Sequence, residues 1–168
     1  MIAPAILGFV LFQRAFELTY AAVNTKALLA RGGVEIGRSH YPFLVALHAV
    51  WLVAIGVAWR QPVPIYWIPL TGYVGLQVLR AWTMISLGPY WTTRIISLPD
   101  APLVHRGPYR FVRHPNYLIV MGEIALLPLV FGEIRVAAIF SLLNAVLLFW
   151  RFREEERALA PRRALQTK

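Results

Sequence analysis

Residues 107–117 read GPYRFVRHPNY and gather cationic, titratable and aromatic side chains between two largely apolar parts of the chain. Arg110, Arg113 and His114 lie within five residues of one another, and Tyr109 and Tyr117 flank them. Arginine binds anionic groups through a planar set of donors, and histidine exchanges a proton near neutral pH. The stretch therefore predicts a site for a charged small molecule. The alternative is a basic loop that anchors to anionic lipid headgroups.

The two prolines of this stretch predict its local structure. Pro115 suits the first turn of a helix, where a missing N–H group costs nothing. His114 precedes a proline and is therefore disfavoured in the helical conformation. We expect His114 at a helix N-terminus, where free N–H groups and the helix dipole favour an anion. Gly107 and Pro108 predict a turn ahead of it.

Residues 151–159 read RFREEERAL and form a second group of charged side chains. Glu154, Glu155 and Glu156 follow Arg151 and Arg153 on what we expect to be the continuation of an apolar helix. One interpretation is a solvated amphipathic tail, which is the usual meaning of a run of charges. The functional interpretation is that carboxylates and cations from the two segments close over a shared ligand.

Composition indicates a membrane protein. The 168 residues are 58% hydrophobic and 15% charged, whereas a soluble globular domain carries roughly 25% charged residues. The chain has no cysteine, which excludes a disulfide framework and a thiolate metal site. Its formal charge is +9, but the basic residues gather at the ends of apolar runs. That placement is typical of membrane topology, so we expect no nucleic-acid partner.

Five apolar segments approach the roughly 20 residues that a membrane-spanning helix needs. They are residues 2–23, 42–59, 65–87, 117–131 and 136–150, of which the fourth is short. The last two are separated by four residues, which predicts a tight helical hairpin. Only helices or closed barrels satisfy the backbone in lipid, so we expect an all-α integral membrane protein with about five transmembrane helices. We expect a single domain over residues 1–168.

Basic residues outside these segments predict the orientation. Thirteen would lie on one side of the membrane and two, Arg60 and Arg135, on the other. Cytoplasmic loops are enriched in lysine and arginine, so the N-terminus is expected outside and the C-terminus inside. For a bacterial chain this means the inner membrane. The thirteen are Lys26, Arg31, Arg38, Arg94, Arg106, Arg110, Arg113, Arg151, Arg153, Arg157, Arg162, Arg163 and Lys168.

Charged residues within the apolar segments are candidates for function, because a charge near the bilayer centre costs at least about 2.5 kcal/mol. Arg14 and Glu17 are three residues apart and can pair on one helix face. Arg80 can either extend to the interface or line a polar pocket. Glu123 has no cation within four residues, so it needs a partner on another helix, a ligand cation or a proton. His48 is expected to be a core histidine.

GPYRFVRHPNY, the short hairpin after it and RFREEERAL together resemble the C-terminal half of the isoprenylcysteine carboxyl methyltransferase family. Members are integral-membrane enzymes that use S-adenosylmethionine. Their hallmark is G-P-Y-R-x-x-R-H-P-x-Y, then a two-helix hairpin, then an R-x-E-E element, and the match covers about residues 103–159. QRAFEL (13–18) and ARGGVEIGRSHYP (30–42) resemble a bacterial branch that is associated with methylating lipid-like phenols and pyrones.

The resemblance implies a cytoplasmic cofactor pocket built by residues 101–159, with residues 1–100 supplying the N-terminal helices. It maps the R-x-E-E element onto Arg153, Glu155 and Glu156, and it places Arg113 near the cofactor. Glu123 is added as a candidate base on chemical grounds. Four histidines without tight spacing indicate no metal site. The expected cofactor-binding residues are Val104, Tyr109, Arg110, His114, Tyr117 and Glu156, and the expected catalytic residues are His114, Glu123, Arg153 and Glu155.

The predicted function is transfer of a methyl group from S-adenosylmethionine to an oxygen atom of a lipophilic acceptor. A prenylcysteine-like carboxylate, a fatty acid, an alkylresorcinol and an alkylpyrone all fit, and membrane lipids are the expected surroundings. The sequence is compatible with a homo-oligomer. Two alternatives are a membrane reductase of related architecture that uses NADPH, and a non-enzymatic membrane protein whose basic loops bind headgroups.

Overall fold

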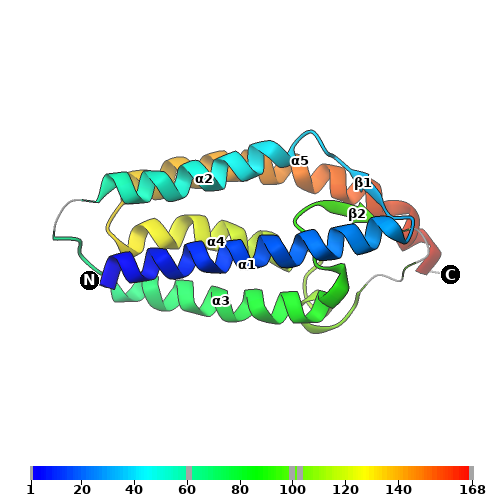
Figure 1. The fold of residues 1–168 in the computed structure, drawn as a ribbon, viewed down its shortest axis with the longest axis horizontal. Helices are drawn as coiled ribbons and strands as arrows, with labels where there is room; N and C mark the ends of the chain where they lie inside the picture. The colour runs from blue at the N-terminus through cyan, green and yellow to red at the C-terminus, as the bar shows by residue number, and fades with distance from the viewer. Residues whose placement is uncertain (1, 60–61, 99–100, 102–103, 167–168) are drawn as a thin grey trace.

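The structure, a computed structural model, is built mainly from five α-helices that run along one long axis (Figure 1). It describes residues 2–59, 62–98, 101 and 104–166, with side chains up to residue 160. The side chains of Arg60, Arg162, Arg163 and Lys168, which entered the charge count, lie outside this description. The helices are α1 (Ile2–Ala30), α2 (Tyr41–Ala58), α3 (Trp67–Leu87), α4 (Pro115–Val130) and α5 (Ile134–Gln166).

The mostly helical class is confirmed, but the expectation of an all-helical chain needs a correction. A two-stranded antiparallel sheet joins β1 (Val34–Ile36) to β2 (Ile95–Ser97), with Val34 opposite Ser97. Strands of three residues are shorter than the four to eight over which alternation of apolar and polar residues can be recognised. Two short 3₁₀ helices, η1 (Gly88–Tyr90) and η2 (Gly107–Arg110), complete the elements.

Three helical segments are long and apolar enough to cross a membrane, within the part of the chain that the structure describes. They are α1, α2 and the Ile134–Ala160 part of α5. α3 has the length, with 21 residues, but a less apolar composition. α4, with 16 residues, is shorter than the roughly 20 residues that a bilayer core needs. Apolar helices of this kind support a membrane protein, and the count of five spans stays a prediction.

The chain reverses sharply between α4 and α5. Gly132 has a φ angle of +79°. Its N–H group donates to the carbonyl of Leu129 at 3.1 Å, and the N–H group of Glu133 donates to the carbonyl of Pro128 at 2.9 Å. This pair of bonds is a helix C-terminal cap that favours glycine, because other residues are strained at positive φ. α5 therefore begins at Ile134 and packs back against α4.

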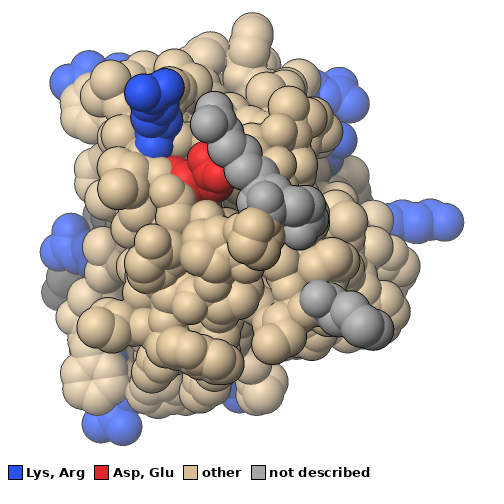
Figure 2. All heavy atoms as spheres, turned by 90° about the vertical axis from the view of Figure 1, so that its left-hand side faces the viewer, with Lys and Arg blue, Asp and Glu red and all other residues tan. Residues whose placement is uncertain are grey.

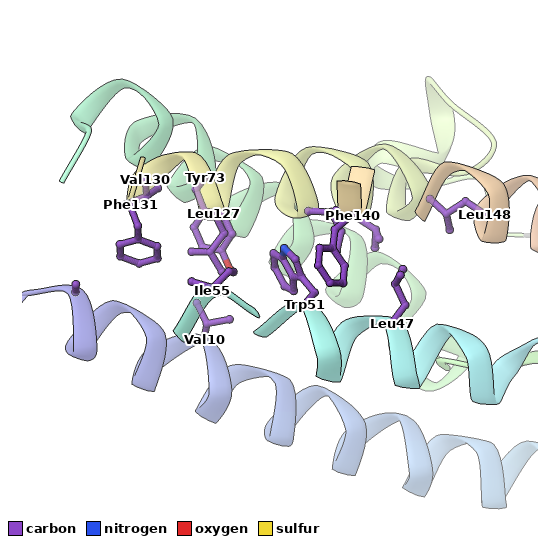
Figure 3. Close-up of a cluster of buried hydrophobic side chains, with 13 residues drawn as sticks. Val10, Leu47, Trp51, Ile55, Tyr73, Leu127, Val130, Phe131, Phe140 and Leu148 are labelled. Atoms are coloured by element: carbon purple, nitrogen blue, oxygen red, sulfur yellow. The ribbon is translucent and has the colours of Figure 1, made fainter. Parts of the chain in front are cut away.

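α4 is the central helix of the bundle, since it packs against α3 and α5, while α2 packs against α5. Buried apolar side chains from separate helices meet in one core (Figure 3). Val10 of α1, Ile55 of α2 and Leu127 of α4 are all fully buried in it. Between membrane helices, such packing relies on close van der Waals contact rather than on the hydrophobic effect.

Four charged side chains meet in the interior of the bundle, of which Glu17, Arg80 and Glu123 are buried and Arg14 is partly exposed. The expected pair exists: Arg14 Nη1 lies 2.7 Å from Glu17 Oε2. Arg14 Nη2 also lies 2.6 Å from Glu123 Oε2. Arg80 pairs with the same two carboxylates, at 3.2 Å from Glu17 and in closer contact with Glu123. Two cations and two carboxylates give this ion cluster, defined as Arg14, Glu17, Arg80 and Glu123, no formal net charge.

The two ends of the bundle differ in charge. Figure 2 looks onto the end that carries the α2–α3 and α4–α5 connections, where most atoms are uncharged and acidic atoms are visible only inside a hollow. Around those connections the described charged residues are Glu133 and Arg135. The opposite end carries the sheet, η1, η2 and the C-terminal part of α5, and it holds most of the basic residues.

Gly107 should be intolerant of a side chain. Its φ angle is +60°, and a Cβ atom would lie 1.9 Å from the Ser86 hydroxyl oxygen. We expect Gly107→Ala to lower the free energy of unfolding in detergent by at least about 1–2 kcal/mol, because both the backbone conformation and the packing become unfavourable. The measurement is thermal unfolding of the purified protein.

Gly75→Ala is the matched control, since a Cβ atom at Gly75 on α3 meets nothing within 4 Å. Alanine is favoured over glycine in a helix by roughly 0.5–1 kcal/mol, so Gly75→Ala should leave stability unchanged or raise it. Equal destabilisation by both substitutions would contradict the packing described at Gly107.

Candidate functional site

A cavity of about 680 Å³ lies at the end of the bundle that carries the sheet. Its wall is formed by the end of α3, η1, β2, the 104–114 segment, the first turn of α4 and the part of α5 beyond residue 150. These elements gather at the right-hand end of Figure 1. Small-molecule sites occupy roughly 300–1,000 Å³, so the cavity has the size for a cofactor and the reacting part of a substrate.

The local structure of GPYRFVRHPNY agrees with its sequence. The N–H groups of Phe111 and Val112 both donate to the carbonyl of Pro108, at 3.0 Å and 3.1 Å, which closes the η2 turn. His114 has φ −130° and ψ 62°, outside the helical region, and Pro115 is the first residue of α4. The prediction that His114 lies at a helix N-terminus is confirmed.

His114 connects the start of α4 to two carboxylates of α5. Its Nε2 lies 2.6 Å from Glu156 Oε1, and its Nδ1 lies 3.7 Å from Glu155 Oε1. The ring stacks on Tyr117, with centroids 5.2 Å apart and an interplanar angle of 6°. Phe152 covers it edge-on at 5.1 Å. The imidazole is therefore held on three sides, and 12% of its side chain is exposed.

Tyr117 and Arg151 orient the carboxylate of Glu155. The Tyr117 hydroxyl donates a hydrogen bond to Glu155 Oε2. Arg151 Nε donates to the Tyr117 hydroxyl at 3.1 Å, and Arg151 Nη1 donates to the backbone carbonyl of Thr93 at 2.8 Å. This chain of contacts joins α4, α5 and the residues before β2, so three segments distant in sequence fix the orientation of Glu155.

Most of the residues expected at the site line the cavity. Tyr109 is one of them, and both its burial and the charge of Glu155 raise its pKa, so the phenol stays protonated and can donate a hydrogen bond. Glu156 does not line the cavity and contacts it through His114. The expected residues that line it are Val104, Tyr109, Arg110, Arg113, His114, Tyr117 and Glu155.

Arg153, an expected catalytic residue, does not line the cavity, and Arg151 does. Residues four apart share a helix face, whereas residues two apart point in nearly opposite directions. Arg151 therefore shares a face with Glu155, and Arg153 is exposed with its guanidinium over the Phe149 ring at 4.6 Å. The spacing in RFREE shows that Arg151, and not Arg153, shares a helix face with Glu155. Which of these faces meets the cavity depends on where the fold places Glu155.

Glu123 also lies away from the cavity wall. Its carboxylate is bound by Arg14 and Arg80 in the ion cluster and accepts a hydrogen bond from Gln77 Nε2 at 2.8 Å. The sequence predicted that the charge of Glu123 needs a partner, and Arg14 of α1 and Arg80 of α3 are partners on other helices. The structure does not bring Glu123 together with His114 and Glu155.

Charge around the cavity is mainly positive. Of the residues that the structure describes, four arginines and one carboxylate, Glu155, line it. Arg94 is held by Glu35 across the sheet at 2.5 Å, with its guanidinium 4.3 Å from the Tyr41 ring centroid. A ligand with both an anionic and a cationic group finds partners of each kind here. The arginines are Arg94, Arg110, Arg113 and Arg151.

A model of the isoprenylcysteine carboxyl methyltransferase family matches residues 67–161. The chain belongs to this family. The matched region runs from the start of α3 through η2 and α4 to the part of α5 that lines the cavity. Membership in the isoprenylcysteine carboxyl methyltransferase family indicates a membrane methyltransferase, and enzymes of this family in general use S-adenosylmethionine.

Two bacterial relatives extend the similarity over nearly the whole chain. The uncharacterized protein YpbQ of Bacillus subtilis is 35% identical over 158 residues, which cover 92% of this chain and 94% of the relative. An uncharacterized protein of Haemophilus influenzae is 27% identical over 160 residues, 90% of this chain and 91% of the relative. No solved structure matches the chain. The similarity thus includes α1 and α2 as well as the family region.

Arg151 and Arg153 should differ in their effect on the site. We expect Arg151→Ala to weaken binding of S-adenosylmethionine or to lower turnover by at least about tenfold, because hydrogen bonds from a charged donor are lost at Tyr117 and Thr93. Arg153→Ala should change both by less than about twofold, as expected for an exposed side chain. Calorimetry in detergent and a methyl-transfer assay measure these effects. Equal losses in the two variants would contradict the site geometry.

Proposed function

We propose that this protein is an S-adenosylmethionine-dependent O-methyltransferase that acts on a lipophilic acceptor in the membrane. The observation that carries the proposal is the cavity that joins the 107–117 segment to Glu155 inside the region matched by the family. The acceptor oxygen would belong to a carboxylate, a phenol or an enol. Prenylcysteine-like acids, alkylresorcinols and alkylpyrones are acceptors of these kinds.

The cavity fits S-adenosylmethionine by its charges. The cofactor has a carboxylate at one end and two cationic centres, an ammonium and a sulfonium. Arg110 and the N-terminus of α4 suit the carboxylate. Glu155 and the ring of Tyr117 suit the cations. When bound, the cofactor supplies an electrophilic methyl group, and the residues of this chain align the acceptor with it and exclude water.

The need for a base depends on the acceptor. A carboxylate is already ionised and needs none, whereas a phenol or an enol gives up a proton during transfer. Of the three candidate bases, His114 and Glu155 line the cavity, and Glu123 does not. The proton would therefore pass to one of the first two. Tyr117 and Arg151 keep Glu155 oriented toward the cavity while it acts.

An apolar groove between α3 and α4 supports a lipophilic acceptor. It has a volume of about 220 Å³, and Leu79 and Leu118 are among the side chains that line it. Phe111 and Val112 line both this groove and the cavity, so the two are adjacent. Burying an alkyl chain contributes about 25 cal/mol per Å² of apolar surface. A tail in the groove would leave the oxygen-bearing head at the cavity.

We further propose that the cavity faces the cytoplasm of a bacterial cell, with the N-terminus outside the inner membrane. The described basic residues concentrate at the cavity end of the bundle, as the enrichment of lysine and arginine in cytoplasmic loops would require. The relatives in Bacillus subtilis and Haemophilus influenzae support a bacterial chain. A donor made in the cytoplasm and an acceptor dissolved in the bilayer would then meet at this end.

Calorimetric titration of the detergent-purified protein tests the proposal. S-adenosylmethionine and S-adenosylhomocysteine should bind, and His114→Ala should weaken binding or turnover at least about tenfold because the stacked ring and its contacts with Glu155 and Glu156 are lost. Elution from a sizing column should not change. Binding of NADPH without binding of either sulfur compound would replace the proposal with a reductase.

Glu155→Gln should lower turnover by at least about tenfold, because the amide keeps the shape of the side chain but loses its charge and its capacity to take a proton. Glu154→Gln is the matched control, since Glu154 pairs with exposed Arg157 at 3.3 Å and does not line the cavity. A methyl-transfer assay compares the two variants. If Glu155→Gln changed only the unfolding temperature, the glutamates would belong to a solvated helix instead.

A further inference from the structure

Asn116 is the point where the buried ion cluster meets the cavity. It lies in the first turn of α4, one residue before Tyr117, and it lines the cavity. Its Oδ1 lies 3.5 Å from Nη1 of Arg80, which also contacts Glu17 and Glu123. Among the described residues, no other residue of the cavity wall forms a hydrogen bond or an ion pair with the ion cluster. Asn116 therefore lines the cavity and also contacts the ion cluster in the interior of the bundle.

The contact with Arg80, at 3.5 Å, favours one orientation of the Asn116 carboxamide. A guanidinium group only donates hydrogen bonds, so it must face the amide oxygen rather than the amide nitrogen. The NH₂ group is then the other arm of the planar carboxamide and points away from Arg80. It has no hydrogen-bond partner among the described residues, and it is not one of the polar atoms enclosed without a partner. A residue that lines the cavity thus carries a donor without a hydrogen-bond partner among the described residues.

Arg80 itself is held rigidly. Its Nε donates to Glu123 Oε1 at 2.8 Å and its Nη2 donates to Glu123 Oε2, so the guanidinium and the carboxylate meet through two parallel bonds. Gln77 and Arg14 fix Glu123 in turn, at 2.8 Å and 2.6 Å. Only 3% of the Arg80 side chain is exposed. A donor fixed before the substrate arrives loses little freedom on binding, which strengthens its contribution.

We propose that Asn116 donates a hydrogen bond from its NH₂ group to a second oxygen of the acceptor, one that is not methylated, and so determines acceptor specificity. The inference rests on the proposed function. It favours acceptors with two neighbouring oxygens, such as a fatty carboxylate or a hydroxypyrone, over an alkylphenol with a single oxygen. Asn116 would contact the substrate, whereas Arg80 and Glu123 are positioning residues that act through it.

The position of the apolar groove agrees with this assignment. The groove lies between α3 and α4, and Arg80, which contacts Asn116, also belongs to α3. Phe111 and Val112 connect the groove to the cavity. An alkyl tail in the groove would bring the head of the acceptor into the side of the cavity where Asn116 is found.

Asn116→Asp tests the donor directly. Aspartate keeps the shape and the oxygen that faces Arg80, but it replaces the donor by an acceptor atom. Methyl transfer is measured with palmitic acid, an undecyl hydroxypyrone and para-dodecylphenol as probes. We expect the KM for the first two to rise at least about tenfold and the KM for the phenol to change less than about twofold. The Kd of S-adenosylhomocysteine should stay within about twofold, because the cofactor is not the partner.

The outcomes separate the two proposals. Equal KM changes for all three probes, or a loss of S-adenosylhomocysteine binding in Asn116→Asp, would overturn the role of Asn116. A wild-type protein that binds S-adenosylhomocysteine but methylates neither palmitic acid nor the hydroxypyrone would also overturn it. A wild-type protein that does not bind S-adenosylhomocysteine would instead overturn the proposed methyltransferase.

Two conservative variants of the ion cluster distinguish positioning from stability. Arg14 and Arg80 both pair with Glu123, but only Arg80 contacts Asn116. A lysine in place of either keeps the charge and loses the planar set of donors. Arg80→Lys should raise the KM for the hydroxypyrone at least about threefold with a smaller change in kcat, and Arg14→Lys should leave that KM within about twofold. Equal KM shifts in the two variants would show that the cluster acts on stability alone.

Discussion

A charge in the hydrocarbon interior of a membrane must be neutralised by a neighbouring group of opposite charge, and this constraint determines how the helices of the bundle are oriented. Arg14, Glu17, Arg80 and Glu123 come from α1, α3 and α4 and satisfy one another within the protein. Removing one partner of a buried pair leaves an uncompensated charge, at a cost of roughly 3–5 kcal/mol. The apolar contacts around them tolerate many side chains of similar size, whereas these four pairs demand defined helix rotations.

The rotation of α4 matters most, because the same helix carries the start of the cavity. Glu123 lies seven residues after Asn116, which is about two turns of helix, so both residues face the same side. Fixing Glu123 between two arginines therefore also fixes the direction of the first turn. The positions of Asn116 and Tyr117 follow from an interaction deep in the bundle rather than from contacts in the cavity alone.

Local rules were enough to predict the parts of this structure that depend on neighbouring residues. His114 before a proline gave a helix start, and the spacing of Arg14 and Glu17 gave an ion pair. The partners of Glu123 could not be predicted in this way, since Arg14 and Arg80 are 109 and 43 residues away along the chain. That Arg151 and not Arg153 lines the cavity could not be predicted for a related reason. A helix pattern defines faces, but only the neighbouring helices decide which face meets the ligand. The sheet was missed because its strands have three residues each.

α5 is a single helix of 33 residues, about 50 Å long at 1.5 Å per residue, whereas the hydrocarbon core of a bilayer is about 30 Å thick. Its beginning is embedded beside α4, and its later turns carry Arg151, Glu155 and Glu156 beyond the apolar region. A single continuous helix thus passes from the apolar region of the bundle to its charged end. Helices adapt to thinner or thicker bilayers by tilting, and a tilt of α5 relative to α4 would change the spacing between His114 and its carboxylates.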